Sequence, residues 1–119
     1  MGDIRRLSVT TEAGTAICVA VEDGHKLHNA IAEGLSAGVP VVVSFAGVKR
    51  LTTAFLNVAF GQLYNEFPEE VVARLLSAGD MDRMTATLLQ RVIERAKQYY
   101  KDAARHDAAA KSIIDGDKH

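Results

Sequence analysis

The chain has 119 residues, which is enough for one folded core and too few for two. Its 14 lysines and arginines nearly balance its 15 aspartates and glutamates, so the formal charge is −1. This balance excludes the strong positive charge on which general nucleic-acid binding depends. Apolar residues make up 48% of the chain, which predicts a packed domain rather than a disordered segment.

The first part of the chain predicts two strands followed by a helix. Apolar and polar residues alternate briefly over residues 7–11, and a second strand is expected over residues 15–21, which are all apolar after Thr15. Cys18, the single cysteine, lies in that segment and is expected to pack as a small apolar side chain. The period then becomes helical, with Asp23 as the expected N-cap and Gly38 as the expected left-handed end.

A third strand and a second helix are predicted in the middle of the chain. The valines that follow Pro40 are typical of a strand covered on both faces. After a connecting loop, a helix is expected from Thr52 to Phe67, closed by Pro68. Large apolar side chains of the loop and helix are expected in the core: Phe45, Phe55, Leu56, Phe60, Leu63 and Phe67.

The remaining pattern predicts a short helix from Glu69, a last strand over residues 74–77 and a long helix capped by Asp82. The inward face of that long helix is expected to carry Met84, Leu88, Val92 and Ala96. We place a single domain at residues 1–101 and a helical or mobile tail at residues 102–119.

Strands that alternate with helices predict an α/β fold. We expect one mostly parallel sheet of four to five strands, packed with helices and followed by the long C-terminal helix. No window approaches the run of about 18 apolar residues that spans a membrane, and no signal-peptide pattern is present. We therefore expect a cytoplasmic protein without membrane contact.

Candidate functional residues gather where the middle strand leads into its helix. A helix N-terminus has unpaired backbone N–H groups that favour a negative group. Thr52 and Thr53 stand at this point, and each fits either a helix cap, worth about 1 kcal/mol, or a modified hydroxyl. Residues expected to contact a protein partner or a small anion are Gly47, Lys49, Arg50, Thr52, Thr53 and Leu56.

Other chemistries have weaker sequence support. His25 and His28 have the spacing of a metal pair, but no further ligands accompany them, so surface histidines are expected. Asp80 and Asp82 fit turn and cap roles. Phosphate-binding loops need several glycines and hydrolases need a nucleophile elbow, and neither pattern occurs. We expect no enzyme activity, no metal and no cofactor.

The central segment resembles a known superfamily. Its residues are Val41-Val42-Val43-Ser44-Phe45-Ala46-Gly47-Val48, followed by Leu51-Thr52-Thr53-Ala54-Phe55-Leu56. They are similar to the middle of STAS domains (sulfate transporter and anti-sigma-factor antagonist), in particular to a STAS-like family of unknown function. In typical antagonists the strand ends in Asp, Gly-Val follows, and Asp-Ser-Ser-Gly-Leu opens the helix. The resemblance extends over residues 15–100.

The resemblance assigns roles to individual positions. Thr53 stands where antagonists carry the serine that their partner kinase phosphorylates, and Thr52 stands where they carry the neighbouring aspartate. Ala54 replaces the second serine, Phe55 replaces the glycine, and Ser44 replaces the aspartate that ends the strand. The resemblance implies a STAS-like fold and a phospho-acceptor at Thr53.

Two functional hypotheses follow. By resemblance, the chain is a non-catalytic regulatory domain that docks through residues 49–56 onto a protein partner, such as a histidine-kinase-like ATPase or a signalling complex that contains one. Alternatively, Thr52 and Thr53 hold a small anion or a nucleotide, with Lys49 and Arg50 nearby, and the ligand itself is the signal. We expect a monomer or a weak homodimer in either case.

Overall fold

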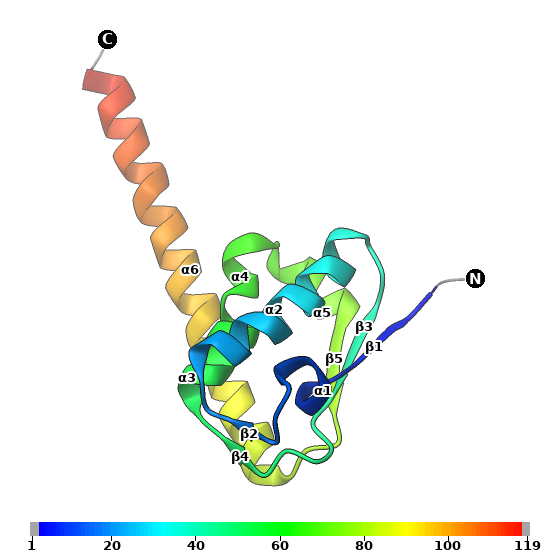
Figure 1. The fold of residues 1–119 in the computed structure, drawn as a ribbon. Helices are drawn as coiled ribbons and strands as arrows, with labels where there is room; N and C mark the ends of the chain where they lie inside the picture. The colour runs from blue at the N-terminus through cyan, green and yellow to red at the C-terminus, as the bar shows by residue number, and fades with distance from the viewer. Residues whose placement is uncertain (1–2, 118–119) are drawn as a thin grey trace.

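A computed structural model describes residues 3–117, with side chains over residues 3–101. Figure 1 shows a body of short strands and helices from which the last helix extends, and the principal extents are 58 × 36 × 24 Å. In chain order the elements are β1 (Arg5–Ser8), α1 (Val9–Ala13), β2 (Ile17–Cys18), α2 (Val21–Ser36), β3 (Val41–Ser44), β4 (Arg50–Leu51), α3 (Thr53–Leu56), the π-helical η1 (Asn57–Gly61), α4 (Leu63–Glu66), α5 (Glu69–Leu75), β5 (Leu76–Gly79) and α6 (Arg83–Asp117).

The strands form two parallel sheets. One has three strands in the order β1-β3-β5, and the other pairs β2 with β4. The α/β class and the parallel pairing are confirmed, whereas the expectation of four to five strands in one sheet is wrong. Residues 50 and 51, expected in a loop, form β4, and β4 takes β2 as its neighbour (Figure 1). The predicted strand over residues 15–21 is limited to Ile17–Cys18, because α2 already begins at Val21.

The N-terminal region forms a short helix where the alternation of apolar and polar residues predicted a strand. Local helix capping outweighs that alternation. Residues 9–11, expected as the end of a strand, form α1 together with residues 12 and 13. The Ser8 hydroxyl accepts a hydrogen bond from the Thr11 backbone N–H at 3.4 Å, and Gly14 ends the helix with φ of 76°. A serine before and a glycine after therefore define one short helix.

Helix α2 is longer than predicted at its start. It begins at Val21, so the expected N-cap, Asp23, lies inside the first turn, and its carboxylate instead pairs with Lys26 at 3.4 Å. The predicted left-handed end at Gly38 is confirmed by φ of 72° and by the hydrogen bond from its N–H to the Leu35 carbonyl at 3.0 Å.

The helical segment after Thr52 is divided into three parts, because residues 57–61 widen to a π-helix between α3 and α4. The predicted apolar stripe is nevertheless confirmed. Phe45 stacks on Phe60 with ring centroids 5.8 Å apart. Five of the six predicted side chains are buried and Phe67 is partly buried against the same core; the five are Phe45, Phe55, Leu56, Phe60 and Leu63.

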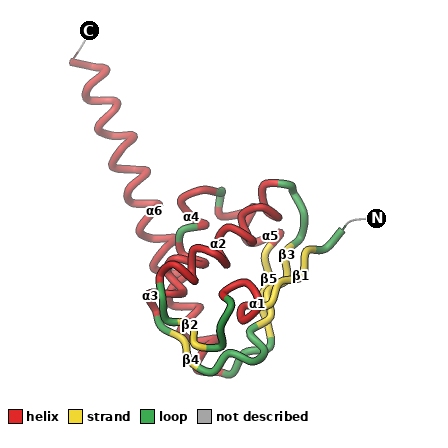
Figure 2. Tube along the Cα trace, in the orientation of Figure 1, coloured by secondary structure: helices red, strands yellow, loops and turns green. Residues whose placement is uncertain are grey.

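The three-stranded sheet is covered on one face. Val41 and Val43 are buried beneath α2, which packs in turn on η1, and η1 packs on α6. Val42 points to the opposite face and is half-buried, so the expectation of a strand covered on both faces is wrong. Figure 2 shows β1, β3 and β5 at the right of the view, with α2 across the centre and the projecting part of α6 at the upper left.

The C-terminal elements follow the sequence prediction with two shifts. Residues 74 and 75 end α5, so β5 starts at Leu76. Asp82 caps α6 as predicted, because its carboxylate accepts the Thr85 N–H at 2.7 Å. Val92 and Ala96 are buried, but Met84 is 74% exposed, since the first turn of α6 precedes the contact with η1.

Residues 102–117 continue α6, and the predicted division after residue 101 stays a prediction; residues 118–119 lie outside the described residues. Within the described residues, none of the helices combines the length and apolarity needed to cross a bilayer.

Close packing of α2 on β3 gives a first prediction. A Cβ at Gly34 would overlap Cγ2 of Val41, a side chain with little rotational freedom, and would lie 3.2 Å from Cδ of Arg5. Gly34→Ala is expected to lower the free energy of unfolding by about 1–3 kcal/mol, despite the better helix propensity of alanine. Chemical denaturation measures the change. Asn29→Ala, at an exposed position of the same helix, is the control and is expected to leave stability unchanged or slightly higher.

The environment of Cys18 gives a second prediction. Burial raises the pKa of its thiol, and the Asp23 carboxylate raises it further. The thiolate, which is the reactive form, is therefore scarcer than in a free cysteine at mildly alkaline pH. In the native protein an aromatic disulfide reagent is expected to modify Cys18 at least about tenfold more slowly than in denaturant. Equal rates in the two conditions would contradict the burial of this side chain.

Candidate functional site

The predicted site lies on the β2–β4 pair and the start of α3. After β3, the chain turns at Gly47, whose φ is 84°, and returns along β2. The Lys49 N–H donates to the Ala16 carbonyl at 2.9 Å, and the Thr52 N–H donates to the Cys18 carbonyl at 3.2 Å. These bonds hold residues 49–52 against residues 16–18, so the start of α3 has a fixed position.

The two threonines have different roles in this arrangement. The Thr52 hydroxyl accepts the Phe55 N–H at 3.2 Å and donates to the Val19 carbonyl at 3.4 Å. Thr52 is therefore the N-cap of α3, as the capping interpretation predicts. Thr53, one residue further on, is exposed at the first helical position. Of the two hydroxyls, that of Thr53 is the one presented to solvent.

Three exposed apolar side chains lie beside these residues. Ile17 is 44% exposed, Val19 is 40% exposed and Val21 is 48% exposed, whereas Cys18 between them is fully buried. The register places Ile17 beside Arg50. We use the term β2–β4 surface for six exposed side chains: Ile17, Val19, Val21, Lys49, Arg50 and Thr53.

Sequence reasoning missed the apolar half of this surface because residues 16–21 read as one buried run. A signal was nevertheless present. The larger side chains occupy the odd positions, and the small Cys18 and Ala20 occupy the even ones. In a strand, odd and even positions face opposite sides. The same residues therefore also fit a strand that buries its small side chains and exposes its larger ones.

One predicted contact residue belongs elsewhere. Leu56 was expected at the partner interface, but its side chain is fully buried. It lies in the core with Phe55, because both follow the N-cap on the inward side of α3. A partner therefore does not reach Leu56 directly, and its role at the site is to support the helix from within.

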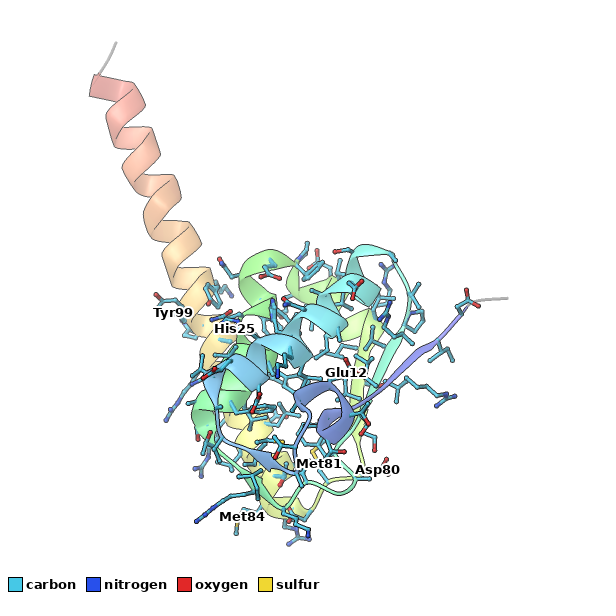
Figure 3. All side chains as sticks on the ribbon, viewed as in Figure 1. Glu12, His25, Asp80, Met81, Met84 and Tyr99 are labelled. Carbon is cyan, nitrogen blue, oxygen red and sulfur yellow. The ribbon has the colours of Figure 1, made fainter. Side chains whose placement is uncertain are left out.

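The basic pair lines a cavity of about 240 Å³, but the threonines do not. Its walls come from residues 48–51, from Asp82, which caps α6, and from the first turns of α6, including Met84. Figure 3 shows Met84 at the end of the molecule that carries β2 and β4. The anion-binding hypothesis requires Lys49 and Arg50 to face the same ligand as the two threonines. Neither Thr52 nor Thr53 lines this cavity, so the four side chains do not share it.

An acidic group stands close to the end of β3, although the sequence has serine there. The Ser44 hydroxyl donates to the Asp80 carboxylate at 2.6 Å and accepts the Ala46 N–H at 3.2 Å. Asp80 follows β5 and has a left-handed backbone with φ of 58°. The carboxylate at this edge of the sheet therefore comes from the neighbouring strand, a contact that its interpretation as a turn residue did not anticipate.

The two histidines of α2 have different environments. His25 is exposed as predicted, but His28 is only 4% exposed, so the expectation of a surface residue is wrong. Its Nε2 lies 2.9 and 3.0 Å from the two carboxylate oxygens of Glu66, which tie α2 to α4. No group of three or more His, Cys, Asp or Glu side chains arranged to hold a metal occurs among the described residues.

Comparison with known families identifies the fold family. The model of the STAS-like domain of unknown function (DUF4325) matches residues 23–85, more than half of the chain, and the chain belongs to this family. The matched segment extends from the first turn of α2 to the first turn of α6 and contains β3, β4 and Thr53. In the other two comparisons, no curated protein and no solved structure matches the chain.

The separation of the two threonines gives a third prediction. Thr52→Ala removes the cap of α3 and is expected to lower the free energy of unfolding by about 1 kcal/mol. Thr53→Ala is expected to change it by less than about 0.5 kcal/mol, because this side chain is exposed. Thermal and chemical denaturation of both variants measure the difference. Equal losses would mean that Thr53 also supports the fold.

Proposed function

We propose that this chain is a non-catalytic regulatory domain of the STAS-like family that docks onto a protein partner through the β2–β4 surface. The observation that carries the proposal is the exposure of Ile17, Val19 and Val21 close in sequence, with Ile17 paired beside Arg50, which follows Lys49. An apolar row next to charge is the composition of an interface with an apolar centre and a polar rim.

The chemistry of this surface defines the partner. Two cations at one border favour an interface with acidic side chains, and three aliphatic side chains favour apolar residues beside those acids. By family resemblance we propose a histidine-kinase-like ATPase that presents such a surface. The cations steer association, while burial of the apolar row slows dissociation.

Thr53 is the proposed regulatory position. A phosphate there adds about −1.5 to −2 charges beside the first backbone N–H groups of α3 and close to Arg50. It also introduces a strongly hydrated group into a surface that docking must desolvate. We therefore propose that phosphorylation of Thr53 releases the partner.

The fourth prediction tests docking. Partners are captured from the organism that encodes the chain, the ATPase is purified, and its affinity is measured by calorimetry. Val19→Ser and Arg50→Glu are each expected to weaken binding at least about tenfold, through lost apolar burial and reversed charge respectively. Thr53→Glu, which mimics part of the phosphate charge, is expected to weaken binding in the same direction.

Matched substitutions outside the β2–β4 surface serve as controls. Ile4→Ser changes another exposed apolar residue, and Arg91→Glu reverses another exposed charge on α6. Both are expected to keep wild-type affinity. Equal effects of Val19→Ser and Ile4→Ser would refute the proposed surface. Saturable thermal stabilisation by a nucleotide alone, lost in Thr53→Val, would instead favour the ligand-sensing hypothesis.

A further inference from the structure

The outer edge of the three-stranded sheet at β5 is unprotected. β5 pairs only with β3, so its other side is a free edge. Its four residues, Leu76–Gly79, include no charged residue and no proline. Natural edge strands usually carry such features because an open edge pairs readily with another strand. The opposite edge, β1, carries Arg5 and Arg6 and is protected in this way.

The register of the sheet identifies which backbone groups are open. The Gly79 carbonyl accepts the Phe45 N–H at 3.0 Å, so Gly79 directs its backbone groups toward β3. Because these groups alternate along a strand, the N–H and C=O of Ala78 point away from β3. They have no hydrogen-bond partner within the described residues.

A cavity of about 240 Å³, lined mostly by apolar side chains, lies beside this strand. It separates β5 from α6, and its walls include Leu76 and Ala78 of the strand with Leu89 and Ile93 of the helix. A strand added at the β5 edge would direct alternate side chains into this cavity. The edge therefore offers both backbone pairing and apolar burial.

We propose that β5 pairs antiparallel with β5 of a second copy of this chain, with Ala78 facing Ala78 across a two-fold axis. The two sheets then join into one of six strands. The charges that flank the strand favour this occupant, because Arg74 precedes β5 and Asp80 follows it. Antiparallel pairing places the basic end of each copy beside the acidic end of the other, whereas parallel pairing would oppose like charges.

The fifth prediction tests this edge with proline. Ala78→Pro removes the outward N–H, and proline is tolerated at such edge positions. The wild type is expected to show a dimer mass by light scattering at submillimolar concentration. Since two symmetric hydrogen bonds are lost, Ala78→Pro is expected to weaken dimerisation at least about tenfold. Arg6→Pro is the matched control, because the Arg5 N–H bonds to the Pro40 carbonyl and the N–H of Arg6 therefore faces outward at the β1 edge.

A second variant keeps the test decisive if proline disturbs folding. In an antiparallel hydrogen-bonded pair the opposed Cα atoms lie about 5.5 Å apart, within the range that a disulfide bridges. Oxidation of Ala78→Cys with diamide is expected to give a covalent dimer, and that of Arg6→Cys only monomer. A monomeric wild type at submillimolar concentration, or equal cross-linking of both variants, would overturn the proposal. Val19→Ser is expected to dimerise normally, which separates this inference from the docking proposal.

Discussion

The close approach of α2 to its two neighbours is the constraint on which the rest of the fold depends. At one end, Gly34 lets the helix lie against Val41 of β3. At the other, Gly24 lies where a Cβ would be only 3.0 Å from the Phe55 carbonyl and 3.2 Å from Cβ of Val58. A side chain at either position would push the helix away from the sheet or from α3. Because both contacts are made, α2 sets the distance between the sheet and the start of α3.

The candidate site is a set of exposed side chains on this closely packed base. Thr52 and Leu56 hold the base together, through a cap and through core packing respectively. Thr53 and Arg50 are exposed, so a modifying enzyme or a binding partner can reach their side chains. The acidic group near the end of β3 comes from Asp80 on the next strand, so a carboxylate is present there although the sequence has serine at position 44. The carboxylate near the end of β3 is therefore kept, but a different strand supplies it.

Much of the fold was readable from the sequence because local chemistry specified it. The left-handed turn at Gly38, the cap at Asp82 and the apolar stripe from Phe55 to Leu63 each depend on residues within a few positions of one another. The pairing of β2 with β4 was not readable, because it joins two-residue segments separated by more than thirty positions. Two residues are too few to show a periodic pattern, so a strand of this length can be identified only from the strand with which it pairs.

For the candidate site, the sequence by itself determined the chemistry that is present: two hydroxyls at a helix start, a basic pair before them and a glycine turn. Only the tertiary structure decided which of these groups face the solvent. It buried Leu56 and His28, made Thr52 a cap, and exposed Val19 beside Thr53. The physical reason is that exposure depends on which distant segments cover a residue. That covering follows from packing across the whole chain rather than from neighbours in sequence.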